Sequence, residues 1–243
     1  MLDSGMPDAP KTNDDLDPNE LDAVKALLVG AAPEKRNEIE AAFEKYQPRF
    51  SIVGDQASDQ HGSWVMEAGN YVHVRFNHRA LRTFWLGCYI VWDCYAEMAR
   101  AVDEGRPFDS TQPEIKLRHL HDLQNSESSL TANWPADVPD PRYFNREEHT
   151  HEEVAPAELS MIAVAWALLH EIRHIQAQQE GWSSTLLESS KKHEEEFECD
   201  RYGAEFLMDS VSVYVKESGE DEETVRLKRG LGIMFAVVVL GLL

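Results

Sequence analysis

His170, Glu171 and His174 form the motif HExxH, the residue set with the clearest chemical meaning in this chain. Residues four apart lie about 40° apart around a helix, so both imidazoles share one face, one turn apart. Two neutral imidazoles at that separation can hold one Zn²⁺ at about 2.0–2.1 Å. Glu171 lies about 100° further round the helix, where it can take a proton from water and return it to a leaving amine. The motif therefore indicates a zinc centre with a neighbouring general base.

A third ligand is expected downstream, where Glu196 and Asp200 lie four residues apart on the next predicted helix. We assign Glu196 as the metal carboxylate and Asp200 as the acceptor for an imidazole N–H, which fixes the tautomer and orientation of that ring. Glu194 and Glu195 are the competing ligands because they adjoin Glu196. The run EEEFE is by itself more typical of a solvated helix face, so the assignment depends on the HExxH motif 22 residues upstream.

HExxH arises by chance in roughly a few per cent of such chains, so the motif alone does not establish a metal site. The alternative interpretation is a helix with two structural histidines. The nine residues before His170, Met161–Leu169, are almost wholly apolar, which puts the motif in a buried wall. Buried polar groups this dense need partners, and a metal supplies one. His193 and Tyr202 are candidate oxyanion donors, although a surface histidine and a packed tyrosine are the commoner situations for these residue types.

The elements that must position these residues are mostly helical. We expect two short helices between Glu20 and Glu44 and a buried helix over 79–102. A short helix over 113–123 lies within an irregular stretch, 104–156. Further helices are expected over 157–179, 192–215 and 222–243. Residues 1–19 are acidic, rich in proline and expected to be disordered, and 20–243 are expected to form one domain whose metal core is 157–215. The fold class is mainly α with a small β element (α+β).

The β element is predicted at Tyr71–Phe76, where apolar and polar residues alternate, with 51–53 as a shorter partner. Because this segment precedes the HExxH helix, we expect it to be an edge strand on which a peptide substrate adds through main-chain hydrogen bonds.

Composition excludes several functions. The net charge of −21 and the pI near 4.8 argue against general nucleic-acid binding, which needs a basic surface. Three scattered cysteines are no disulfide framework, and the acidic N-terminus lacks the features of a signal peptide, so a cytoplasmic protein is expected. Leu231–Leu243 is uncharged but shorter than the roughly 20 residues of a membrane span. A buried core helix is therefore favoured there over membrane contact.

The two helices together resemble a known group of enzymes. HExxH on an apolar helix followed by ExxxD on a second helix resembles the gluzincin metallopeptidases. The string EFECDRYGAEFL is similar to the E-F-x-A-D-x-x-A motif of HtpX-like and ImmA/IrrE-type peptidases, with Cys199 where alanine is usual. The acidic character and the position of the motif in the C-terminal half most resemble the Lit-type phage-exclusion peptidases. The resemblance is strong over about residues 157–210.

This resemblance implies a zincin-like core in a cytosolic bacterial zinc protease, with His170, His174 and Glu196 as ligands and Glu171 as base. The known action of the Lit family is cleavage of translation elongation factor Tu during phage infection. We therefore expect an endopeptidase with a specific protein substrate, such as a host translation factor. We also expect an activating protein or peptide, since a free intracellular protease would harm its host.

The competing hypothesis is a regulatory or toxin–antitoxin-type binding module whose HExxH site is structural. An open coordination position separates the two hypotheses, because structural zinc sites are closed.

Overall fold

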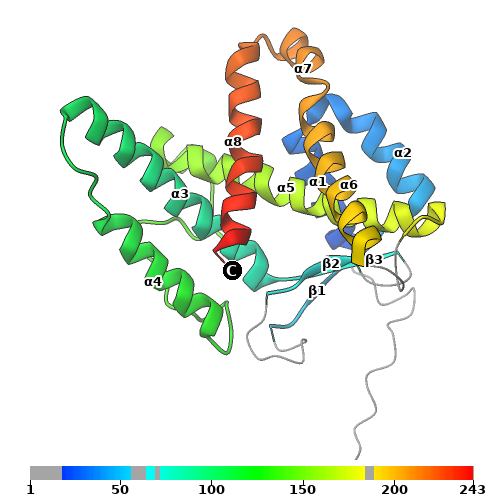
Figure 1. Ribbon diagram of the computed structural model, residues 1–243, viewed down its shortest axis with the longest axis horizontal. Coiled ribbons are helices and arrows are strands. Elements are labelled where there is room, and N and C mark those ends of the chain that lie inside the picture. Colours follow the sequence, from blue (N-terminus) through cyan, green and yellow to red (C-terminus); the bar gives the residue numbers. More distant parts are fainter. Residues whose placement is uncertain (1–17, 56–63, 69–71, 184–188, 243) are drawn as a thin grey trace, which may run out of the picture.

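The computed structural model describes residues 18–55, 64–68, 72–183 and 189–242 (Figure 1). The chain is mainly α with a small β element, as predicted. The expected disorder of residues 1–19 falls almost wholly outside the described residues. The helices are α1 (Pro18–Ala31), α2 (Arg36–Tyr46), α3 (His78–Glu104), α4 (Thr111–Asn125), α5 (His151–Glu180), α6 (Ser189–Met208), α7 (Val211–Ser218) and α8 (Glu222–Gly241), with short 3-10 turns at Pro33–Lys35 and Arg146–Glu148.

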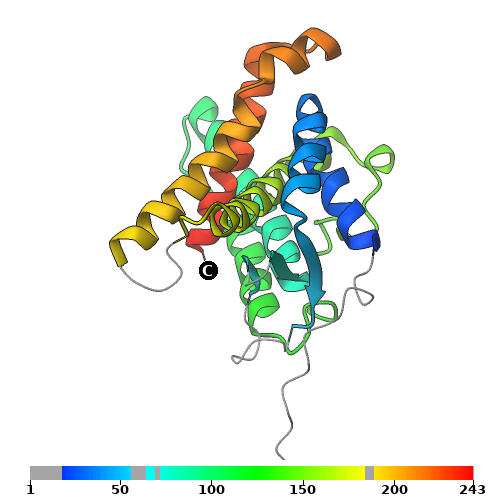
Figure 2. The same ribbon diagram turned by 90° about the vertical axis from the view of Figure 1, so that its right-hand side faces the viewer.

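Helix α5 is the centre of the molecule, and α1, α3, α6, α8 and strand β2 all pack against it (Figures 1 and 2). Its first half is almost entirely buried, from Val154 to Leu169. Among the described helices it alone is long and apolar enough to cross a membrane, but 72% of that stretch is buried inside the molecule. Burial in a protein core therefore accounts for its composition.

The start of α5 differs from the prediction, which placed 151–156 in an irregular stretch. The helix begins six residues earlier because Thr150 and Glu153 form a reciprocal capping box. Pro156 lies inside the helix, where it leaves one carbonyl without its usual partner. The predicted helix over 192–215 is also divided, since α6 ends at Met208 and α7 starts at Val211.

Two glycines let neighbouring helices approach α5 closely. A Cβ on Gly203 of α6 would lie 3.0 Å from the ring of Trp166 and 3.1 Å from its carbonyl oxygen. A Cβ on Gly232 of α8 would lie 2.5 Å from Cγ2 of Ile162. A Cβ at 232 would collide with Ile162, whereas one at 203 would press tightly on Trp166. The close contact at Gly203 lies where α6 packs beside the C-terminal half of α5.

The sheet contains three described strands, β1 (Arg49–Val53), β2 (Met66–Ala68) and β3 (His73–Asn77), in the order β1-β3-β2. Strand β3 pairs parallel to β1 and antiparallel to β2. The segment predicted over 71–76 is therefore the central strand, except that Tyr71 lies outside the described residues. Its prediction as an edge strand is wrong, because both of its sides are occupied by other strands.

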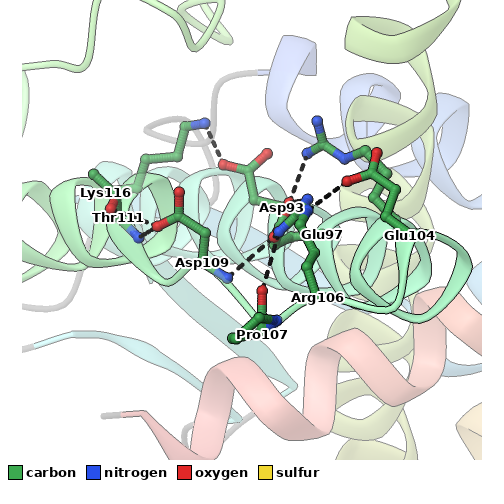
Figure 3. A network of polar contacts seen from close by, with 9 residues as sticks. Asp93, Glu97, Glu104, Arg106, Pro107, Asp109, Thr111 and Lys116 are labelled. Atoms are coloured by element: carbon green, nitrogen blue, oxygen red, sulfur yellow. Dashed lines mark hydrogen bonds and ion pairs between the residues drawn. The ribbon is translucent and has the colours of Figure 1, made fainter.

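A polar network joins the end of α3 to the start of α4 (Figure 3). Glu97 accepts hydrogen bonds from Arg106 and from the backbone N–H of Asp109 at 3.0 Å. The Arg106 hydrogen bond is the main reason why the pKa of Glu97 is lowered to about 2. Lys116 of α4 pairs with Asp93 of α3 in the same region. These contacts hold the C-terminal end of α3 and the start of α4 together.

Candidate metal centre

The two histidines of HExxH converge at the end of the buried part of α5. Nε2 of His170 and Nε2 of His174 lie 3.1 Å apart, and their rings are steeply inclined at 70°. Both side chains are only slightly exposed. Burial, followed by the nearby His174, lowers the pKa of His170, which favours the neutral imidazole. The neutral form is the one that binds a metal.

Helix α6 brings Glu196 to the same point. Its Oε2 lies 3.3 Å from Nε2 of His170 and 3.4 Å from Nε2 of His174. These are the residues of the described chain whose ligand atoms are grouped closely enough to hold a metal ion. In a tetrahedral zinc site with bonds of about 2.0–2.1 Å, ligand atoms are about 3.3–3.4 Å apart. The donor set and its spacing therefore fit zinc.

Each histidine is oriented through its other ring nitrogen by a carboxylate of α6. Nδ1 of His170 lies 2.8 Å from Oδ1 of Asp200, and Nδ1 of His174 lies 2.9 Å from Oε1 of Glu195. Ser183 Oγ donates a further hydrogen bond of 2.9 Å to Glu195. This arrangement leaves both Nε2 atoms facing Glu196, which is the orientation that a shared metal requires.

Sequence reasoning did not find the role of Glu195, which it treated as a competing ligand. The structure separates the two neighbouring acids by burial, since the side chain of Glu195 is 8% exposed and that of Glu196 is 43% exposed. Successive helical residues point about 100° apart, so one carboxylate reaches behind His174 while the other reaches in front. The HExxH spacing alone carries no signal of this choice. Glu194 is exposed.

Glu171 lies beside the histidines and against the sheet. Its Oε2 accepts a hydrogen bond of 2.5 Å from the backbone N–H of Ala68 in β2. Burial raises the pKa of Glu171 to about 7, although His174 and the Ala68 N–H oppose this change. A carboxyl group with a pKa near neutrality can both accept and release a proton at physiological pH.

The site opens into a solvent-accessible cavity of about 400 Å³. The three grouped side chains, those of His170, His174 and Glu196, lie on its wall. The wall also includes Glu171, Ser183, Lys192 and Glu195, together with Glu67 and Ala68 from β2. A larger cavity of about 580 Å³ lies elsewhere, between the N-terminal part of α5 and α8, and contains none of the HExxH residues. The grouped side chains therefore lie on the wall of a cavity that is open to solvent.

The two candidate oxyanion donors do not belong to the wall of this cavity. Tyr202 is largely buried, and its hydroxyl accepts a hydrogen bond of 3.3 Å from Gln176. Its ring also lies near the guanidinium of Arg173. His193 is exposed on α6. The role of either side chain as an oxyanion donor therefore stays a prediction.

The strand that borders the cavity is β2, which the sequence analysis missed. Val65 and Asn77 exchange main-chain and side-chain hydrogen bonds, so Val65 faces β3. By alternation, Met66 and Ala68 direct their main-chain groups away from β3, as the Ala68–Glu171 bond shows. The edge beside the HExxH helix is therefore formed by β2.

Comparison with known proteins defines the class of this chain. A family model matches residues 74–243, which is 170 of the 243 residues and includes α5, α6 and every side chain of the predicted metal site. The protein is a peptidase. It belongs to the Peptidase U49 family. No curated protein and no solved structure gives a significant match to the chain.

Proposed function

We propose that the protein is a zinc-dependent cytoplasmic endopeptidase of the gluzincin group and the Lit type. His170, His174 and Glu196 would hold the zinc, and Glu171 would act as the general base. The observation that carries this proposal is the triangle of ligand atoms with sides of 3.1, 3.3 and 3.4 Å. Membership of a peptidase family supports hydrolysis of a peptide bond as the reaction.

The chain's own residues account for the proton transfers. Bound zinc would supply a Lewis acid that lowers the pKa of water and polarises a peptide carbonyl. Glu171 takes a proton from the attacking water on a carboxylate oxygen and delivers it to the leaving nitrogen. Asp200 and Glu195 hold the Nδ1–H tautomers of the two histidines through their hydrogen bonds.

Strand β2 supplies the surface for the substrate backbone. Its outward main-chain groups, at Met66 and Ala68, border the cavity that contains Glu171. An extended peptide can add to such an edge through main-chain hydrogen bonds. The Ala68 N–H would then have two possible acceptors, the substrate backbone and the carboxylate of Glu171.

By resemblance to the Lit type, the substrate is a host translation factor and the biological role is phage exclusion. An activating protein or peptide is part of the proposal, because the cavity is open to solvent and the cytoplasm offers many unintended substrates. Membrane contact through Leu231–Leu243 remains the less favoured alternative.

The test is an incubation of the zinc-loaded protein with a bacterial lysate and with purified elongation factor Tu. The wild type should give one discrete new band that disappears with a chelator and returns with zinc. Glu171→Gln should bind zinc as the wild type does and give no band. Cleavage that survives chelation, or a Glu171→Gln variant that cleaves at the wild-type rate, would refute the proposed mechanism.

The second candidate, a binding module with a structural metal, is supported by the same ligand geometry. The open cavity at Glu196 and His170 argues against it, because structural zinc sites are closed by protein ligands. The Glu171→Gln variant distinguishes the two candidates, because an enzyme would lose cleavage with its general base, whereas a protein with a structural site has no cleavage to lose.

A further inference from the structure

The metal centre has more negative charge than one zinc ion can balance. Glu196 faces both Nε2 atoms, and Asp200 and Glu195 each lie within hydrogen-bond distance of a histidine Nδ1. When ionised, these three carboxylates carry one negative charge more than the two positive charges of a zinc ion. Because ligand histidines are neutral, the centre is negative as a whole before a substrate binds.

The proposed reaction needs a positive group beside this centre. When water adds to the carbonyl carbon, its oxygen forms the new C–O bond and its proton passes to Glu171. The electron pair of the C=O double bond moves to the carbonyl oxygen, so one negative charge passes from Glu171 to the substrate. Because zinc would polarise this oxygen, the charge appears close to the carboxylate of Glu196. A positioned donor at that point stabilises the transition state.

Lys192 is the one lysine or arginine on the described wall of the cavity. Two other donors on the same wall are already engaged, since the Ala68 N–H donates to Glu171 and Ser183 Oγ donates to Glu195. Nζ of Lys192 has no ion pair with a described residue, so its charge is available to a molecule in the cavity. An ammonium has three N–H donors and no acceptor, which suits an oxyanion.

The packing of α6 on α5 directs Lys192 towards the metal centre. Three contacts between the two helices follow one another about a turn apart, at Trp166–Gly203, His170–Asp200 and His174–Glu195. Residue numbers rise along α5 as they fall along α6, so the next facing pair is Gln178 and Lys192, which both line the cavity. Lys192 is therefore on the side of α6 that faces α5, one turn from Glu196.

The same helix face carries Glu196. Residues four apart on a helix share a face, and the rise between them is about 6 Å. Helical side chains lean towards the N-terminus, so the carboxylate of Glu196 lies over the turn that begins at Lys192. The flexible four-carbon stem of a lysine lets its ammonium reach the space around that carboxylate. The ammonium can therefore meet a substrate oxygen that lies beside Glu196.

We propose that Lys192 is a catalytic residue that stabilises the oxyanion formed from the scissile carbonyl, a role that rests on the proposed function of the metal centre. Its Nζ donates a hydrogen bond to the carbonyl oxygen and offsets the negative charge that the three carboxylates leave uncompensated. His193 and Tyr202 do not line the cavity, so Lys192 is better placed for this role than either of them.

Steady-state cleavage by the zinc-loaded full chain tests this role, with the protein that is cut in the lysate assay as the substrate. Lys192→Met should lower kcat about 100-fold and leave KM within a factor of about three, because the charge that it offsets exists only in the transition state. Lys192→Arg keeps a positive donor, so its kcat should exceed that of Lys192→Met by about tenfold or more. Lys191→Met is the matched control, since it removes the same charge from the adjacent exposed position and should keep the wild-type kcat.

Two binding measurements give readouts that do not depend on turnover. Loss of a nearby positive charge should leave the zinc Kd of Lys192→Met unchanged or lower it, whereas damage to the fold would raise it. Acetohydroxamate, a small anion that binds metals through two oxygens, can be titrated into the cobalt-substituted protein and followed by visible absorption. Its Kd should be about tenfold higher for Lys192→Met than for the wild type and Lys191→Met.

A kcat of Lys192→Met within about twofold of the wild type would overturn the proposal, as would an equal loss in Lys191→Met. A change in KM alone would also overturn it and would show that Lys192 binds an acidic part of the substrate instead. A zinc Kd that rises as kcat falls would show a structural role, with the same consequence. A wild type that binds zinc but cleaves no protein refutes the proposed function alone, and the acetohydroxamate titration then decides the role of Lys192.

Discussion

Glu195 offers the sharpest test of the metal centre, because its role follows from the structure and not from the motif. Its Oε1 lies 2.9 Å from Nδ1 of His174 and holds that ring so that Nε2 faces Glu196. Glu195→Ala removes the acceptor and the adjacent negative charge while leaving all three proposed zinc ligands in place. His174 can then rotate or adopt the other tautomer.

The magnitude follows from the general effect of such partners on metal sites. Loss of a carboxylate that orients a ligand histidine lowers metal affinity about 10- to 100-fold, or about 1.4–2.7 kcal/mol. Glu195→Gln keeps an acceptor oxygen in place, so its loss should fall at or below the lower end of that range. Zinc affinity can be measured by competition with a chromophoric chelator, independently of any protease assay.

Glu194→Ala is the matched control, because it removes an exposed acid from the adjacent position of the same helix. It changes the net charge by the same amount and should leave the zinc Kd within a factor of about two. Equal Kd values for Glu195→Ala and the wild type would refute the positioning role. Equal losses in both variants would show that overall charge, and not the His174 hydrogen bond, sets the affinity.

Three further outcomes are expected. Ala68→Pro removes the N–H that donates a hydrogen bond to Glu171, at an outward position of an edge strand where proline is tolerated. Cleavage should be lost while zinc affinity stays unchanged. Ala68→Ser keeps the N–H and should cleave normally. The pKa of Glu97 is about 2 in the folded protein, against an ordinary value of 4.5. The stabilisation of the fold by its carboxylate is therefore complete above pH 4.5 and is lost as the pH falls towards 2. In urea unfolding, the difference in the free energy of unfolding between wild type and Glu97→Gln should shrink over that pH range and stay constant above it. Gly232→Ala should destabilise the fold by about 1–3 kcal/mol because the new Cβ would collide with Ile162 of α5. A Cβ at Gly230 has no neighbour within 4 Å, so Gly230→Ala should stabilise α8 by up to about 1 kcal/mol in the same urea measurement.

The helices and the convergence of His170 and His174 could be predicted because both depend on local periodicity. The 3.6-residue repeat puts His170 and His174 on one face wherever their helix lies, and the apolar run before them predicts a buried helix. The third candidate ligand could be placed among the consecutive acids 194–196 of the next helix, with Glu196 as the preferred one. The mainly helical fold class was also predictable from the length and number of such runs.

The strand assignments failed for a physical reason. Whether a strand is central or at an edge depends on its partners, and β2 has only three residues, too few to show an alternating pattern. Its partner β3 carries the strong alternation, so the sequence points to the wrong member of the pair. The N–H that contacts Glu171 belongs to Ala68, and a backbone group leaves no mark in side-chain patterns.

The choice among the consecutive acids of α6 was not local either, because it depends on how α6 is rotated against α5. That rotation is fixed where Gly203 lies on Trp166, whose Nε1 also donates to the carbonyl of Asp200 at 3.3 Å. A larger residue at 203 would push or turn α6 and would move the whole acidic face relative to His170 and His174. Helix packing therefore decides which carboxylate is buried behind a histidine ring and which is half exposed at the cavity. The packing contact lies about one turn from His170 on α5 and about two turns from Glu196 on α6.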